Sequence, residues 1–292
     1  MADKMEYTTT GKPHPYHLVR PSIWPLMGAL AGGLLATGAL MYMHEVKIGD
    51  VAVGLNGIYL GVLSILLVMF FWWKDVVHEA VTEKVHNKVT ETGLRYGMTL
   101  FIASEVMFFV AFFWAFFNGA LFPSEAIGFT WPPQNIEVIG PFGLPFLMTM
   151  ILLLSGCTVT WAHHAILEGK NDQAVKALGI TVLLGTIFLG FQIFEYFHVH
   201  FGFTEGIYPS AFFMATGFHG FHVFVGTIFL AVCWRRAQKG HFTKDKHFGF
   251  EAAAWYWHFV DVVWLFLFIA VYWWGNTIGI DHTALATTPI AP

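Results

Sequence analysis

Seven stretches of the chain are long enough and apolar enough to cross a membrane as helices. A helix needs roughly 20 apolar residues to cross about 30 Å of hydrocarbon. The stretches cover approximately residues 23–43, 53–73, 96–122, 141–161, 177–197, 209–234 and 252–274. Strands of a membrane barrel would alternate apolar and polar residues, and these stretches do not. The sequence therefore predicts an all-α membrane protein with seven transmembrane helices in a single transmembrane domain, residues 1–292.

The composition excludes several other classes of protein. Only 12% of the 292 residues are charged and 56% are hydrophobic, whereas roughly a quarter are charged in an ordinary soluble domain. A net charge of −4 at pH 7 gives no sign of a nucleic-acid partner. The two cysteines, Cys157 and Cys233, lie far apart inside apolar stretches and provide no disulfide framework or CxxC site.

The connections between the predicted helices differ sharply in positive charge. Of the 15 Lys and Arg residues, all but Lys47 lie in the N-terminal segment and in the second, fourth and sixth connections. Positive residues are held on the cytoplasmic or matrix side of a membrane. We therefore expect the N-terminus on that side and the C-terminus on the other.

Local patterns predict a close contact between helices and the structure of two connections. Gly28 with Gly32, and Gly57 with Gly61, have the small-xxx-small spacing that lets two helix backbones approach closely. The charged segment 74–92 carries valines near the helical period and predicts a helical extension at the membrane surface. We expect the connection 123–141 to be an ordered, irregular loop.

Glu105 is a candidate functional residue because a carboxyl at membrane depth is costly. It lies ten residues past Arg95, and phenylalanines dominate its helical neighbours. With no basic residue in its own span, we expect Glu105 to be protonated at pH 7. The alternative is a structural hydrogen bond to a neighbouring helix.

Two other acidic residues lie in the spans, each three positions from a histidine. Asp261 follows His258 on the same helical face, so we expect the two to pair. Glu195 and His198 have the spacing of one di-iron ligand motif, but such sites need two motifs and further glutamates. We expect Glu195 to be solvated or to tether a loop.

The remaining histidines do not predict a metal site. A haem or copper site needs several converging ligands. His163 and His164 fall at the inner end of the fourth span, whereas His198 and His200 fall at the outer end of the fifth. We therefore predict no metal ligand and no catalytic residue in this chain. A metal-dependent membrane oxidoreductase, or a transporter built around Glu105 and Asp261, is the alternative function.

Several motifs identify a family. They include Trp72-Trp73-Lys74-Asp75, Gly93-Leu94-Arg95-Tyr96-Gly97-Met98, Trp131-Pro132-Pro133, Thr160-Trp161-Ala162-His163-His164, and Phe248-Gly249-Phe250-Glu251. Together with their order along roughly residues 13–275, they make the chain resemble the subunit III family of haem-copper cytochrome c oxidases. The resemblance implies two helices splayed from five, forming a V-shaped cleft that holds phospholipids.

The resemblance also implies a non-catalytic role in aerobic respiration. The complex moves electrons from cytochrome c to O2 and pumps protons, with haem and copper in partner subunits and no cofactor in this chain. The chain would bind subunit I directly, join other subunits including subunit II, support proton uptake and stabilise the active site. It would lie in a bacterial or mitochondrial inner membrane. A related quinol or nitric oxide reducing complex is the alternative.

Bound phospholipid would need cations near the inner membrane surface, where each is worth about 1 kcal/mol towards anionic lipid. The candidate cationic or donor groups are Lys74, His86 and Arg236. Trp73 and Trp114 are the candidate apolar or indole contacts.

Overall fold

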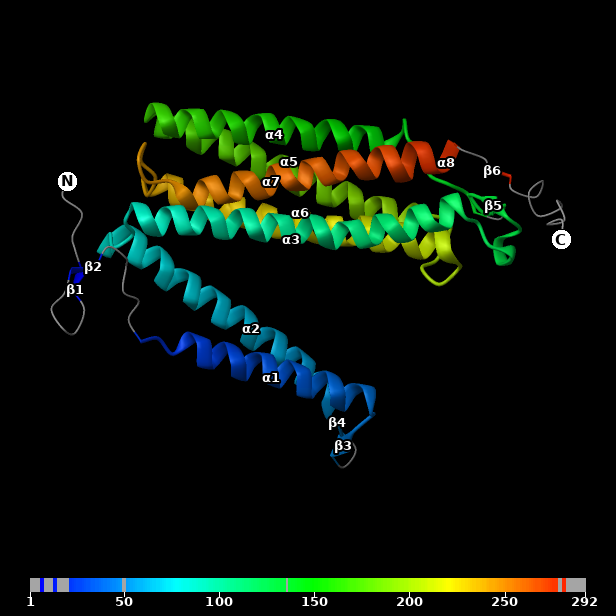
Figure 1. Cartoon of the computed structure of the whole chain (residues 1–292), viewed down its shortest axis with the longest axis horizontal. Helices are drawn as coiled ribbons and strands as arrows, with labels where there is room; N and C mark the ends of the chain where they lie inside the picture. Colours follow the sequence, from blue (N-terminus) through cyan, green and yellow to red (C-terminus); the bar gives the residue numbers. More distant parts are fainter. Residues whose placement is uncertain are drawn as a thin grey trace, which may run out of the picture. The chain divides into compact units, whose positions relative to one another are not determined.

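The computed structural model is built almost entirely of helices (Figure 1). It describes residues 6–7, 13–14, 21–48, 51–134, 136–277 and 280–281. Three cations that contribute to the predicted topology, Lys4, Lys12 and Arg20, lie outside these residues.

Seven helices in the described part of the chain are long and apolar enough to span a membrane, which confirms the predicted fold class. They are α1 (Trp24–Met43), α2 (Val53–His78), α3 (Lys88–Leu121), α4 (Leu144–Glu168), α5 (Asn171–His198), α6 (Ile207–Gln238) and α7 (Phe248–Leu267). A π-helical turn, η1 (Glu79–Glu83), continues α2, and η3 (Phe268–Trp274) with α8 (Gly275–Thr277) continues α7. Most helices outrun the predicted windows because their backbones continue into charged turns that a hydropathy criterion rejects.

Outside the membrane helices, the described residues form short regular elements. Three antiparallel pairs of two-residue strands occur: β1 (Glu6–Tyr7) with β2 (Pro13–His14), β3 (Lys47–Ile48) with β4 (Val51–Ala52), and β5 (Thr130–Trp131) with β6 (Ile280–Asp281). The expected irregular loop holds β5 and the 3-10 turn η2 (Glu125–Ile127), and buries Trp131 against Phe116 and Tyr208. The expected surface helix is interrupted: η1 ends at Glu83, where Lys84 adopts a left-handed conformation, and the chain becomes helical again at Lys88, the start of α3.

The helices fall into two compact units, Met1–Leu94 and Arg95–Pro292. The first contains α1 and α2, and the second contains most of α3 together with α4 to α7. This division agrees with the predicted grouping into two and five helices. We call the second unit the five-helix unit.

Helices α1 and α2 touch through glycines. A Cβ on Gly38 would collide with the backbone of Gly57, and one on Gly61 would lie 2.5 Å from the Cα of Leu35. The prediction was therefore right for Gly57 and Gly61. It was wrong for Gly28 and Gly32, whose added Cβ atoms would meet nothing closer than 4.0 Å within the described residues.

A Gly61→Ala substitution is expected to destabilise this helix pair by about 1 kcal/mol, because overpacking forces the backbones apart. Gly32→Ala is the matched control, since an added methyl there meets nothing within 4 Å and alanine favours helix. Thermal unfolding of the purified protein in detergent, followed by circular dichroism, compares the two. Equal shifts of the unfolding midpoint would contradict the packing argument.

Helix α7 lies at the centre of the five-helix unit and buries most of its surface. Two of its tryptophans are fully buried and donate to hydroxyls of α4: Trp257 Nε1 to Ser155 Oγ and Trp264 Nε1 to Thr149 Oγ1, both at 2.9 Å. These bonds satisfy the only polar atom of each indole and fix the rotation of α7 against α4.

Candidate functional site

Glu105 of α3 pairs with His222 of α6. Glu105 Oε2 lies 2.8 Å from His222 Nε2, and their side chains are 22% and 7% exposed. The rings of Phe108 and Phe109 pack against the imidazole, with centroids 6.0 and 4.9 Å away. The predicted window 96–122 holds no basic residue, but α3 itself begins at Lys88 and includes Arg95. The histidine that pairs with Glu105 comes from a helix more than a hundred residues further along the chain.

The hydrogen bond of His222 Nδ1 shows that this nitrogen carries a proton. His222 Nδ1 is 2.6 Å from the carbonyl oxygen of Phe218, and since a carbonyl only accepts, Nδ1 must donate. The short contact between Nε2 and Glu105 then needs one more proton, carried either by the carboxyl or by the imidazole. The pair can pass this proton between oxygen and nitrogen without changing its net charge.

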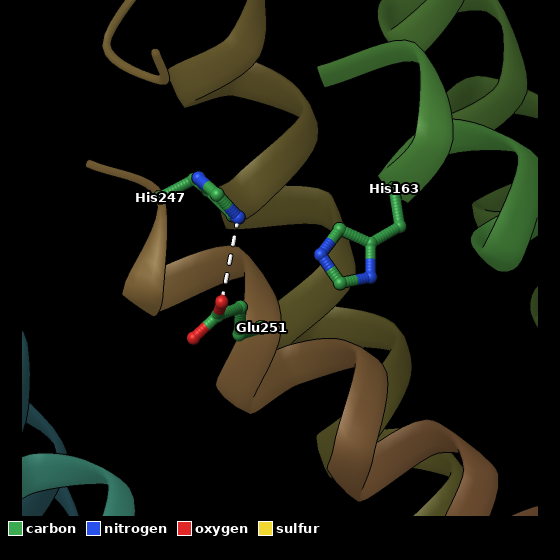
Figure 2. A group of neighbouring side chains, drawn as sticks. All are labelled: His163, His247 and Glu251. Atoms are coloured by element: carbon green, nitrogen blue, oxygen red, sulfur yellow. Dashed lines mark ion pairs between the residues drawn. The ribbon is translucent and has the colours of Figure 1, made fainter. Parts of the chain in front are cut away.

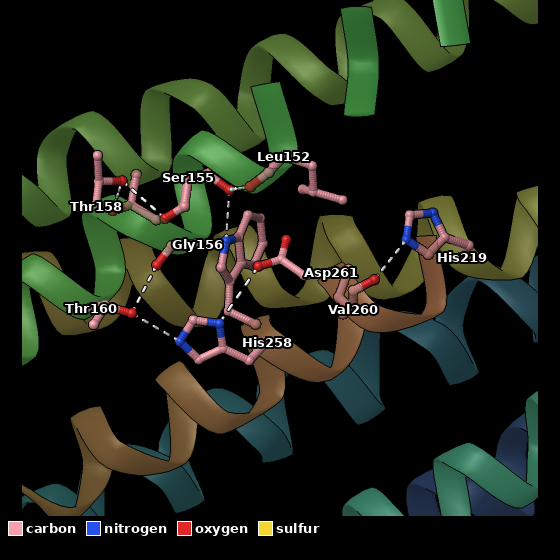
Figure 3. A network of polar contacts seen from close by, with 11 residues as sticks. Leu152, Ser155, Gly156, Thr158, Thr160, His219, His258, Val260 and Asp261 are labelled. Atoms are coloured by element: carbon pink, nitrogen blue, oxygen red, sulfur yellow. Dashed lines mark hydrogen bonds and ion pairs between the residues drawn. The ribbon is translucent and has the colours of Figure 1, made fainter. Parts of the chain in front are cut away.

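Asp261 and His258 of α7 also pair, as expected, at 3.6 Å between Oδ2 and Nδ1 (Figure 3). The other imidazole nitrogen lies 3.2 Å from Thr160 Oγ1, whose hydroxyl donates to the Gly156 carbonyl. Gly156 is required here, because a Cβ would collide with Asp261 Oδ2. Buried Asp261 Oδ1 has no hydrogen-bond partner among the described residues. The pair is thus held between α7 and α4.

Glu195 is not solvated, and that expectation was wrong. Its residue is 3% exposed, and Oε2 accepts hydrogen bonds from Tyr272 Oη at 2.8 Å and Gln192 Nε2 at 3.1 Å. The π-helical continuation of α7 brings Tyr272 over it. His198 is exposed and bonded within its own helix to the Phe194 carbonyl, so the E-x-x-H spacing forms no ligand pair.

The five candidate lipid residues are divided between the two units. Trp73 and Lys74 are exposed near the end of α2, and His86 follows η1. Trp114 lies on α3 and is 75% exposed, whereas Arg236 is half-buried near the end of α6. Trp114 follows Arg95 by 19 positions, about 28 Å along a helix, which places it far from the charged end of α3.

Arg236 has polar neighbours that the sequence did not single out. Its guanidinium lies over the ring of Phe242 at 4.7 Å. Arg236 Nε and His241 Nδ1 are both buried without a hydrogen-bond partner among the described residues. Burial and the charges of Arg236 and Lys239 lower the pKa of His241. An anion at this place would supply the missing acceptor.

A further cluster brings together His163, His247 and Glu251, which are far apart or unrelated in the sequence analysis. His163 of α4 lies beside His247, which immediately precedes α7, and Glu251 in the first turn of α7 (Figure 2). The spacing of His247 and Glu251, four positions apart, is a signal that could have been read from the sequence. Their position beside His163 could not.

Comparison with known proteins covers most of the chain. A sequence model of the family described as Cytochrome c oxidase subunit III matches residues 14–276. The chain is 56% identical to Cytochrome c oxidase subunit 3 of Arabidopsis thaliana and 57% identical to that of Marchantia polymorpha, each over 263 residues, covering 90% of this chain and 97% of the relative. The counterpart in Branchiostoma floridae is 50% identical over 265 residues, which cover 91% of this chain and 98% of the relative. The matched region includes all seven membrane helices.

Proposed function

The chain belongs to the cytochrome c oxidase subunit III family and is a subunit of the respiratory oxidase in an energy-transducing membrane; from this premise we propose that it is a non-catalytic subunit. In this proposal it binds subunit I directly, in a complex that also includes subunit II, while haem and copper stay in the partner subunits. It retains phospholipids, supports proton uptake and protects the oxygen-reducing site.

The polar environment of Arg236 carries the lipid part of this proposal. A phosphate accepts hydrogen bonds from a guanidinium and attracts the nearby charge of Lys239. Arg236 Nε and His241 Nδ1 are buried donors or acceptors without partners among the described residues, so a headgroup would satisfy groups that are otherwise costly to bury. Exposed Lys74 is proposed as a further cation for anionic lipid, and exposed Trp73 and Trp114 as contacts for acyl chains.

An Arg236→Ala, Lys74→Ala double variant is expected to lose anionic phospholipid from the purified oxidase, because about 1 kcal/mol per cation is removed. Native mass spectrometry measures the lipid that co-purifies, and repeated turnover measures how long activity persists. Arg235→Ala, on the exposed neighbour of Arg236, is the matched control. Unchanged lipid content in the double variant, or equal loss in the control, would contradict the proposal.

The pair of Glu105 and His222 supports the proposed role in proton uptake. At 2.8 Å it holds a proton between an acid and a base in apolar surroundings, where a free ion would be costly. Asp261 Oδ2 and His258 Nδ1, 3.6 Å apart, are too distant to share a proton in this way. Glu105 is the more accessible acid, since 22% of its side chain is exposed compared with 9% for Asp261. We therefore propose Glu105, and not Asp261, as the residue that exchanges protons with the surroundings.

The proposed topology places the end of α6 in the cytoplasm or matrix. In a variant with Cys157 and Cys233 replaced by alanine, a cysteine at Ser124 is expected to react with a membrane-impermeant thiol reagent added outside. A cysteine at Gln238 is expected to react only after the membrane is opened. The reverse pattern would invert the topology. Labelling of both cysteines from the same side would contradict the proposed topology, because the three spans α4, α5 and α6 separate the two positions.

A further inference from the structure

The cluster of His163, His247 and Glu251 has the composition and spacing of a metal site. One ligand atom from each residue can be chosen so that all three lie within 4.8 Å of one another. Two ligands of a tetrahedral zinc ion, each about 2.0–2.1 Å from the metal, stand about 3.3 Å apart. His247 Nε2 lies 3.4 Å from Glu251 Oε1, so one edge of such a site is already formed.

The tautomer of His247 makes this contact unusual. Its Nδ1 lies 2.9 Å from the Thr243 carbonyl oxygen and must donate to it. In the neutral ring, Nε2 then carries a lone pair directed at a carboxylate oxygen. The side chain is only 6% exposed, and Nε2 makes no hydrogen bond within the part of the chain that the structure describes. A lone pair facing an anion at this depth calls for a cation between them.

Outer contacts hold two of the three groups in place. The Thr243 carbonyl orients the His247 ring, and Arg95 holds Glu251 through Nε to Oε2 at 2.9 Å and through a terminal nitrogen to Oε1 at 3.3 Å. Metal-binding imidazoles and carboxylates typically have such hydrogen-bonded outer partners. In Figure 2 the His163 ring turns one nitrogen toward the other two residues. His163 is half-buried, which leaves a coordination position for water.

We propose that His163, His247 and Glu251 bind a divalent metal ion of the zinc type, which links α4 to the start of α7. Because Arg95 offsets the charge of Glu251, the two imidazole nitrogens provide most of the attraction. Imidazole favours Zn2+ over Mg2+ or Ca2+. This proposal departs from the prediction that the chain holds no metal, which weighed His163 against distant histidines and did not consider His247 with Glu251.

Zinc uptake by the whole oxidase tests the site. The purified complex is first treated with a chelator and then titrated with Zn2+ in competition with a chromophoric zinc indicator, with Mg2+ as the contrasting ion. The wild type is expected to bind one more Zn2+ than the His163→Gln or His247→Gln complex. Loss of an outer partner alone weakens metal sites about 10–100-fold, and loss of a ligand is expected to weaken this one by at least as much.

His164→Gln is the matched control, because His164 is an exposed neighbour on the same helix and lies outside the cluster. It is expected to bind Zn2+ like the wild type. Since His247 is buried and its variant could fail to assemble, the half-buried His163→Gln carries the comparison, and the ratio of this chain to haem verifies assembly. Equal uptake by wild type and His163→Gln, no uptake by the wild type, or equal loss in His164→Gln would overturn the proposal. Equal uptake by the wild type and His163→Gln is the result expected if His247 is simply protonated and forms an ion pair with Glu251, with no metal between them.

Discussion

Replacing Trp257 with alanine is expected to destabilise the five-helix unit by about 3–5 kcal/mol, the range for deleting a buried aromatic side chain. Trp257 is fully buried in the middle of α7. Its indole packs so closely that Cβ atoms added to Gly185 or Gly226 would lie 2.7 and 2.9 Å from it. The loss would therefore leave a cavity and remove the indole N–H that Ser155 Oγ accepts, while the Ser155 hydroxyl would still donate to the Leu152 carbonyl. Heating the purified oxidase and following the release of this chain measures the effect. The temperature at which half of the chain is released should be lower in the variant.

Two variants separate packing from hydrogen bonding at Trp257. Trp257→Phe keeps most of the ring but removes the bond to Ser155 and is expected to cost about 1 kcal/mol for that bond, plus the smaller loss of ring volume. Phe197→Ala removes an aromatic side chain that is 82% exposed on α5 and is expected to leave the midpoint nearly unchanged. A Trp257→Ala protein no less stable than Phe197→Ala would refute the central position of α7.

Substituting His222 with phenylalanine is expected to cost about 3 kcal/mol, because removing one member of a buried pair leaves the other without a partner. Glu105 then has no base within hydrogen-bond distance and should hold the proton itself. Infrared spectroscopy is expected to show the carbonyl band of a carboxylic acid without the shared hydrogen bond. The band should be absent from a Glu105→Gln, His222→Phe protein. The same carboxyl spectrum in wild type and His222→Phe would show that the two residues do not share a proton.

Glu105 shows which features of a site can be predicted from the sequence and which cannot. Its apolar neighbours follow from helical periodicity, and the structure places the rings of Phe108 and Phe109 beside its partner His222. Its partner does not follow, because His222 lies on another helix. Nothing in the sequence distinguishes His222 from the other histidines as the partner of Glu105. Helical spacing tells which residues share a face, but not which helix that face meets.

Glu195 and the glycines of α1 show the same limit. Glu195 was placed near a helix end and expected in water, because nothing local indicates that Tyr272 covers it. Gly28 and Gly32 have the same spacing as Gly57 and Gly61, yet only the second pair lies at a close helix contact. A membrane helix that is apolar on all sides carries little information about which side faces lipid and which faces a neighbour.

The sequence by itself determined the seven membrane helices, the fold class and the family, because hydropathy over about 20 residues and short motifs are local properties. Tertiary structure alone decided which polar side chains on different helices meet. The pairing of Glu105 with His222, the cover over Glu195, and the position of His163 beside His247 and Glu251 all depend on how helices distant in sequence rotate and pack. That choice comes from close packing of tryptophans against glycines and from hydrogen bonds between helices, which no single segment encodes.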